Sequence, residues 1–260
     1  MTPVSPKKAL GQHFLVDRNV LGVIERLAAL EPDDVVLEIG PGLGVLTTFL
    51  ADRVRFVHAI EIDRGLEPSL EDALEGRENV SLTFGDALAL DIEALGPPPS
   101  KLVANLPYNV ATPLVAETLA GVPAIRSWCV MVQREVADRF FAMPRTKAYG
   151  AVSVLVRLHA RRTGFHPVSR TVFRPPPNVD SALVAFERVA PPADAARVRR
   201  VVVGGFGHRR KTLANALSLA GVTSREHAVA ALEAIGRRPD TRAEALEPEE
   251  FVRLTEALDA

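Results

Sequence analysis

The sequence predicts an α/β protein with a doubly wound, mostly parallel sheet and a second, small domain made only of helices. Short apolar runs alternate with helical patterns from the start of the chain to about residue 143. Beyond the proline-rich segment 190–195, only helical patterns follow. A chain of 260 residues, 47% of them hydrophobic, is long enough for one sizeable core and a small appendage.

Strands and helices are predicted to alternate along the first half of the chain. Short apolar runs bounded by loop residues are typical of buried parallel strands, and they lie at 35–40, 55–63, 79–86, 101–106 and 127–133. Apolar residues at helical spacing predict helices around these strands, at 19–30, 45–53, 65–74, 112–120 and 134–143. Pro113 suits the first turn of its helix, where a missing N–H costs nothing.

The alternation then changes. The runs 151–160 and 181–189 are predicted as strands, and because no helix separates them they can pair antiparallel. Four helical patterns follow the segment 190–195. We therefore expect a first domain over 1–190 and a helical domain over 191–260.

Composition excludes several classes of protein. Cys129 is the single cysteine, which rules out an internal disulfide and argues against a Cys-based metal site; we expect it to be a buried small hydrophobe. The N-terminus has no apolar signal region and no stretch approaches a membrane span. These observations predict a cytoplasmic protein without bound metal and without membrane contact.

The net charge of −1 conceals an asymmetry. Residues 126–212 hold 17 Lys and Arg against 5 Asp and Glu, and residues 141–179 hold no acid at all. A long block of one sign predicts a surface that faces a polyanion, here nucleic acid. The alternative is a solvated basic face without a partner.

The stretch "EIGPGLGVLT", residues 38–47, lies between the first predicted strand and its helix. Gly40, Gly42 and Gly44 allow a tight turn and a close approach of the backbone to a ligand. Their spacing is G-x-G-x-G rather than the dinucleotide fingerprint G-x-G-x-x-G. With Glu38 before them, they favour a ligand that has a positively charged amino-acid tail, such as S-adenosylmethionine. A purely structural glycine turn is the alternative.

Two further acids follow strands. Glu61 ends the second strand, where a carboxylate can accept from both ribose hydroxyls of an adenosine; Asp63 is placed to start the next helix. Asp86 ends the third strand, where it can accept from an adenine amino group. Any one such acid is more often a helix cap, but ligand-bearing ends on successive strands favour a binding site.

The fourth strand ends in "NLPYN", residues 105–109, and here the chain closely resembles the ribosomal RNA adenine dimethyltransferases, in their small-subunit branch. The resemblance runs nearly end to end. Its motifs are "GQHFL" (11–15), "LEIGPGLGVLT" (37–47), "EID" (61–63), "GDAL" (85–88), "NLPYN" (105–109), "MVQREVADR" (131–139), "FRPPPNVDSA" (173–182) and "RRKTLANAL" (209–217).

This resemblance implies a Rossmann-like class I methyltransferase fold, with a seven-stranded, mostly parallel sheet that includes an antiparallel hairpin, and a small C-terminal all-α domain. The implied activity is S-adenosylmethionine-dependent dimethylation of N6 of two adjacent adenosines near the 3′ end of small-subunit (16S) rRNA. The implied cofactor-binding residues are His13, Leu15, Gly40, Glu61, Asp86 and Asn105. Many members have asparagine where this chain has His13.

The resemblance also implies roles for "NLPY". The Asn105 side-chain oxygen and the Leu106 carbonyl can accept from the adenine amino group and make its nitrogen more nucleophilic. Pro107 stiffens the loop, and Tyr108 offers a face on which the base can stack. Phe173 is expected to be the second wall for a flipped base, with core packing as the alternative.

The cations Arg209, Arg210 and Lys211 are predicted to open a helix and to contact RNA phosphates, which sets affinity and placement rather than base identity. Taken alone they favour a solvated helix face. The similar motif in the family is typical of the branch that needs a structured ribosomal particle, so the predicted partner is rRNA within the assembling small subunit. A monomer is the default expectation.

Three other functions compete. A large-subunit (23S) rRNA methyltransferase of the macrolide-resistance type shares "NLPY", but "RRKTLANAL" and the helical tail argue against it. A DNA adenine methyltransferase would more typically carry a D-P-P-Y-like motif, which the chain lacks. A ribosome-assembly factor that binds without turnover would be indicated by a degenerate glycine loop or "NLPY", and both are intact.

Overall fold

The computed structural model describes residues 6–7, 10–208 and 210–259. By their contacts the residues form two compact units. The first unit holds Met1–Ala137 and Arg161–Arg188, and the second holds Asp138–Ala160 and Val189–Ala260. Within the described part of the chain, no helix is both long and apolar enough to cross a membrane.

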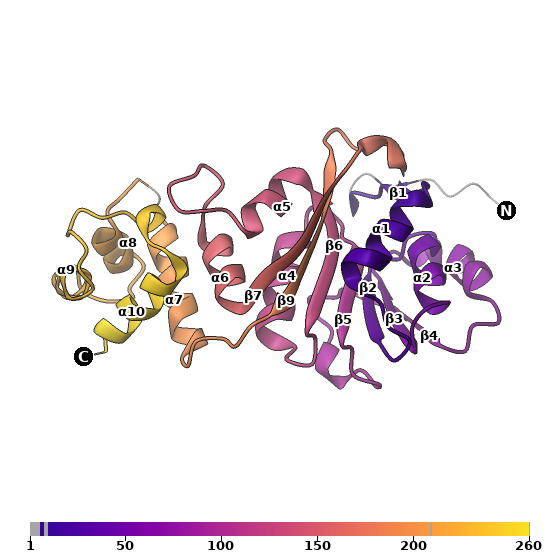
Figure 1. Ribbon diagram of the computed structural model, residues 1–260, viewed down its shortest axis with the longest axis horizontal. Coiled ribbons are helices and arrows are strands. Elements are labelled where there is room, and N and C mark those ends of the chain that lie inside the picture. The colour runs from indigo at the N-terminus through magenta and orange to yellow at the C-terminus, as the bar shows by residue number, and fades with distance from the viewer. Residues whose placement is uncertain (1–5, 8–9, 209, 260) are drawn as a thin grey trace. The chain divides into compact units, whose positions relative to one another are not determined.

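A seven-stranded sheet organises the first unit, with the order β4-β3-β2-β5-β6-β9-β7 (Figure 1). Its strands are β2 (Val35–Ile39), β3 (Phe56–Glu61), β4 (Val80–Phe84), β5 (Lys101–Asn105), β6 (Ser127–Gln133), β7 (Ala160–Val168) and β9 (Ser181–Arg188). The strands from β4 to β6 pair parallel, whereas β9 runs antiparallel to β6. The predicted mixed sheet is confirmed.

Five helices form where they were predicted: α1 (Asn19–Ala28) precedes β2, and α2 (Val45–Ala51), α3 (Glu67–Leu74), α4 (Ala111–Gly121) and α5 (Arg134–Phe140) follow parallel strands. The apolar face of α1 packs on β6 and β9, and α2 packs on β3. Cys129 is 1% exposed within the core that these elements share, which confirms its prediction as a buried hydrophobe. Burial also raises the pKa of its thiol to about 12, so the thiol stays protonated.

A second, two-stranded sheet was not predicted. It pairs β1 (Phe14–Leu15) antiparallel with β8 (Phe173–Arg174), so that Leu15 faces Phe173. Val16 extends the contact, because its N–H donates to the carbonyl of Val172. This pairing ties the N-terminal segment to the loop that precedes β9.

The predicted strand 151–160 is wrong: the segment forms the helix α6 (Ala151–His159), and β7 (Ala160–Val168) is the neighbour of β9. Its valines favour a strand by propensity, but tertiary contacts decide. The buried Ser153 hydroxyl accepts from the N–H of Gly150 at 3.1 Å and donates to the carbonyl of Arg139 at 2.6 Å. Val154 and Leu158, one helical turn apart, then bury in the core of the second unit.

The second unit is helical. After α6 it contains α7 (Ala195–Phe206), α8 (Leu213–Leu219), α9 (Arg225–Ala234) and α10 (Pro248–Ala257). These helices share one core with Tyr149 and Leu158. The contacts therefore group 138–160 with the C-terminal helices, whereas the predicted domain boundary near residue 190 stays a prediction from composition.

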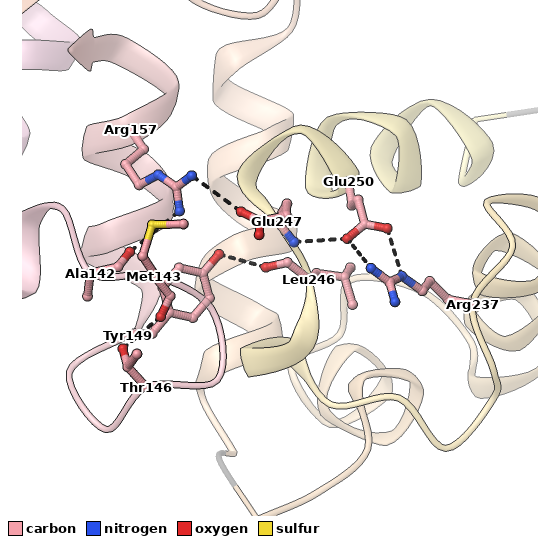
Figure 2. Close-up of polar contacts among 9 residues, drawn as sticks. All are labelled: Ala142, Met143, Thr146, Tyr149, Arg157, Arg237, Leu246, Glu247 and Glu250. Carbon is pink, nitrogen blue, oxygen red and sulfur yellow. Dashed lines mark hydrogen bonds and ion pairs between the residues drawn. The ribbon is translucent and has the colours of Figure 1, made fainter.

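Polar contacts bind the α6 region to the segment before α10 (Figure 2). The buried Tyr149 hydroxyl donates to the carbonyl of Leu246 at 2.7 Å. Arg157, on α6, lies 3.3 Å from the carboxylate of Glu247. Burial raises the pKa of Tyr149 above its ordinary range, so the phenol remains a donor in this bond.

Candidate active site

One cavity opens at the carboxyl ends of β2, β3 and β5. It draws its lining residues from four segments: 10–15, 38–46, 61–66 and 105–108. Parallel strands bring their carboxyl ends to one edge of the sheet, and α/β proteins bind ligands there. The structure thus brings together the glycine loop, Glu61, "NLPY" and the "GQHFL" segment, all of which the sequence predicted to form one site.

The glycine loop has the backbone that its sequence requires. Gly40, Gly42 and Gly44 have φ angles of 75°, 61° and 78°, in the left-handed region that favours glycine. A Cβ at Gly40 would lie 3.3 Å from the ring of Pro107, and one at Gly42 would lie 3.1 Å from the ring of Phe14. Any side chain would therefore push the loop away from the neighbouring "NLPY" and N-terminal segments.

The two polar atoms of the Asn105 side chain, its amide nitrogen and its amide oxygen, differ in their hydrogen bonding. Its amide nitrogen donates to the carbonyl of His13 at 3.3 Å. Its side-chain oxygen is buried and has no hydrogen-bond partner among the residues that the structure describes, which is costly unless a ligand supplies a donor. The N–H of Leu106 donates to the carbonyl of Met131 at 3.0 Å and fixes the loop to β6. The amide oxygen is thus a buried acceptor on a residue that lines the cavity.

Tyr108 is held at both ends. Its hydroxyl and that of Ser181 share a hydrogen bond of 2.5 Å, and its ring lies 5.6 Å from the ring of His13, tilted by 33°. Nδ1 of His13 donates to the carbonyl of Pro175 at 2.8 Å. Burial raises the pKa of Tyr108, so the phenol is neutral. The two rings form part of the cavity wall.

Two buried acids lie beneath the glycine loop. Glu38 is 1% exposed, and one of its oxygens has no hydrogen-bond partner within the described ranges. Burial raises its pKa to about 8, and the nearby Glu61 contributes to the increase. Glu61 accepts from the N–H of Gly42 at 3.2 Å and of Asp63 at 2.9 Å. Its pKa is also raised, mainly by burial.

Two predicted site residues lie elsewhere. Asp86 is exposed, is not among the residues that line the cavity, and its carboxylate accepts from the N–H of Leu88 at 3.0 Å. Phe173 is 1% exposed and packs in the core opposite Leu15. Core packing, the alternative for Phe173, is the arrangement observed, and its ring offers no open face to a base. Adenine contact by Asp86 stays a prediction.

The predicted phosphate contacts need one correction. Arg209 lies outside the described residues. Arg210 and Lys211 are exposed but precede α8, which begins at Leu213 after its N-cap Thr212. The cations therefore precede the helix instead of forming its first turn.

Hydrogen bonds that join Lys7, Gln12 and Asp63 beside the cavity were not predicted from the sequence. Lys7 and Gln12 both donate to the carboxylate of Asp63. Gln12 lies in the motif "GQHFL" and Asp63 in "EID", so both were visible as motif members, but their pairing spans about fifty residues and had no local signal. Among the described residues, no cluster of three or more His, Cys, Asp and Glu side chains could hold a metal ion.

Comparison with known proteins gives consistent matches. The family model of the ribosomal RNA adenine dimethylases matches residues 4–260. Ribosomal RNA small subunit methyltransferase A of Rubrobacter xylanophilus is 50% identical over 250 residues, which cover 96% of this chain and 94% of the relative.

Two solved structures are similar over nearly the whole chain. A dimethyladenosine transferase from Plasmodium falciparum has a TM-score of 0.79 at 24% identity and covers 93% of this chain and 96% of its own, which is a likeness of fold. The 23S rRNA methyltransferase ErmE has a TM-score of 0.68 at 32% identity and covers 95% of this chain and 100% of its own.

Proposed function

Because the chain belongs to the ribosomal RNA adenine dimethylase family, we propose that it uses S-adenosylmethionine to methylate N6 of adenosines in ribosomal RNA. The observation that carries this proposal is that Asn105 lines a cavity together with the glycine loop, and that its buried side-chain oxygen has no partner in the described part of the chain. The finer proposal is dimethylation of two adjacent adenosines near the 3′ end of small-subunit (16S) rRNA in the assembling particle.

The residues of the cavity fit the cofactor. A Cβ at Gly40 or Gly42 would be crowded by Pro107 or Phe14, and without side chains the backbone of this turn can approach a ligand closely. The buried Glu38 carboxyl suits a cationic amino group, and Glu61 suits the ribose hydroxyls. His13 and Leu15 line the same cavity and would cover the amino-acid end. When bound, S-adenosylmethionine supplies an electrophilic methyl group on its sulfonium.

The residues of "NLPY" prepare the acceptor. The adenine amino lone pair is delocalised into its ring, so that nitrogen is a poor nucleophile. The oxygen of Asn105 and the carbonyl of Leu106 accept its hydrogens and favour the tetrahedral nitrogen as charge develops. Pro107, packed against Gly40, fixes their direction. Tyr108 supports the base by stacking. Asn105 is neutral, so the proton leaves late, to solvent.

The basic block supplies the interaction with RNA. Arg210 and Lys211 are exposed in the second unit, next to Arg209 in the sequence. Neutralised phosphates release counterions, so such contacts increase affinity for any RNA backbone. We propose that the protein acts as a monomer on small ribosomal subunits in the cytoplasm.

Methyl transfer tests this proposal. Labelled cofactor is supplied with small subunits, large subunits, naked rRNA or duplex DNA in parallel reactions. Label should enter small subunits in preference to the other three. The likeness to the 23S rRNA methyltransferase ErmE makes large subunits the informative competitor. Label on large subunits alone would overturn the small-subunit assignment, and no label anywhere would favour an assembly factor without turnover.

A further inference from the structure

Residues 10–15, the N-terminal strap, form one wall of the cavity. The C-terminal half of the strap has two attachments. The carbonyl of His13 accepts from Asn105, and Phe14 and Leu15 pair with β8. The ring of Phe14 also lies against Gly42. These contacts place the strap beside the glycine loop, as part of the cavity lining.

Asp63 binds Gln12 in the other half of the strap and Lys7, which precedes the strap in the sequence. Nε2 of Gln12 donates to one carboxylate oxygen at 2.8 Å, and Nζ of Lys7 donates to the other at 2.5 Å. The amide of Lys7 donates in turn to Oε1 of Gln12 at 2.7 Å. The Asp63 side chain is only 4% exposed, whereas that of Lys7 is 55% exposed. A nearly buried carboxylate thus gathers two donors from a segment about fifty residues away in the sequence.

Asp63 occupies a turn that also belongs to the site. Its own N–H donates to Glu61, the proposed ribose ligand, and its carboxylate accepts from the N–H of Gly65 at 2.9 Å. Although burial alone would raise it, the bonds from Lys7 and Gln12 hold the pKa of Asp63 below its ordinary value. A movement of the strap therefore acts on the turn that carries Glu61.

We propose that Asp63 is a positioning residue, which holds the N-terminal strap at the cofactor cavity through Gln12 and Lys7. By holding the strap, Asp63 sets the residence times of S-adenosylmethionine and of its demethylated form, S-adenosylhomocysteine. This inference rests on the proposed function for the identity of the ligand. The attachment itself does not, because it consists of contacts among side chains of this protein.

The test uses Asp63→Asn and Gln12→Ala in the full chain. Asparagine keeps the shape of the side chain and an acceptor for Gly65, but it loses the charge that Lys7 and Gln12 bind. Asp91→Asn is the matched control, since Asp91 is exposed and caps a similar short turn by accepting from the N–H of Glu93 at 3.2 Å. Hydrogen exchange of residues 10–15 is measured without cofactor, and the dissociation rates of S-adenosylmethionine and S-adenosylhomocysteine are measured separately.

Exchange of the strap and both dissociation rates should rise about tenfold in Asp63→Asn, as expected for the loss of a charge-assisted hydrogen bond. Gln12→Ala should have a similar effect. The effect of the double variant on exchange and dissociation should be smaller than the sum of the two single effects, because both substitutions remove the same attachment. The KM for the cofactor should rise while kcat at saturation is retained. Asp91→Asn should resemble the wild type.

Unchanged exchange and dissociation in Asp63→Asn, or equal changes in Asp91→Asn, would overturn the inference. If Asp63→Asn does not fold, Gln12→Ala and Lys7→Ala decide the question by the same two measurements, and unchanged values in both would refute it. If the wild type binds no S-adenosylmethionine, the proposed function fails, whereas the exchange of the strap without cofactor still tests the attachment.

Discussion

At the scale of single residues, Asn105 connects three parts of the site. Its nitrogen holds the strap at His13, its oxygen is a buried acceptor without a partner, and its carbonyl lies near the glycine loop at Gly40. A buried acceptor left unpaired is costly in a folded protein. We interpret the Asn105 oxygen as an acceptor that is already positioned to bind the amino group of adenine.

Asn105→Ala should abolish methyl transfer, with a loss of at least about 100-fold, because one acceptor of developing charge is removed. Cofactor affinity should fall by less than about tenfold, the expected effect of the single bond to His13. Transfer from labelled cofactor and calorimetric binding measure the two effects. A variant that folds normally and turns over like the wild type would refute the acceptor role.

Glu38 predicts how cofactor binding depends on pH. Its raised pKa of about 8 leaves the carboxyl protonated in the free protein at neutral pH. A bound ammonium group favours the carboxylate, so binding should release a proton and become tighter as the pH rises from about 6 to about 7.5. Calorimetry in two buffers of different ionisation enthalpy measures this release. Glu38→Gln should remove it, and an equal release in that variant would contradict the assignment.

At the scale of elements, the local sequence pattern determines some segments of the chain, and tertiary contacts determine others. The strands from β2 to β6 could be predicted because each is a short apolar run with a clear boundary. The segment 151–160 could not, since its valines favour a strand while the capping contacts of Ser153 and the core of the second unit impose a helix. The burial of Phe173 has the same cause, because it depends on the pairing of β8 with β1.

The start of α10 holds an ion pair that predicts a pH dependence of stability. Arg237 donates to both carboxylate oxygens of Glu250 at 2.7 and 2.6 Å, and Glu250 also accepts from the N–H of Glu247 (Figure 2). The bonds from Arg237, opposed by burial, lower the pKa of Glu250. A lowered carboxyl pKa stabilises the fold above the unfolded value of about 4.5, and this stabilisation is lost as the pH falls through the folded pKa.

Glu250→Gln should therefore lower the Tm at pH 7 and make it less sensitive to pH between about 5 and 3. Glu256→Gln, on the exposed face of the same helix, is the control and should behave like the wild type. Thermal unfolding at several pH values measures both variants. The prediction is contradicted if Glu250→Gln leaves the pH dependence unchanged.

At the scale of the whole molecule, function depends on bringing two properties of the sequence together. One is the cavity for a methyl donor, which could be predicted because its motifs end successive parallel strands. The other is the basic block of residues 126–212, which composition alone revealed. The attachment of Gln12 and Lys7 to Asp63 could not be predicted, because it joins distant segments through side chains without a local pattern.

Substitution of Arg209, Arg210 and Lys211 by Ala should weaken binding to small subunits and reduce the slope of log affinity against log salt by about 2 to 3, near one unit for each lost phosphate contact. Binding measured over a series of salt concentrations provides the slope. Arg55→Ala, an exposed cation outside the basic block, is the control and should leave it unchanged. Equal slopes for the triple variant and the wild type would refute phosphate contact.

Mass spectrometry of small-subunit rRNA fragments after reaction with the protein and S-adenosylmethionine tests the central proposal most directly. The account predicts two methyl groups on N6 of each of two adjacent adenosines near the 3′ end, and none after reaction with Asn105→Ala. Methyl groups at another position or on another base, or the same modification by Asn105→Ala, would contradict it.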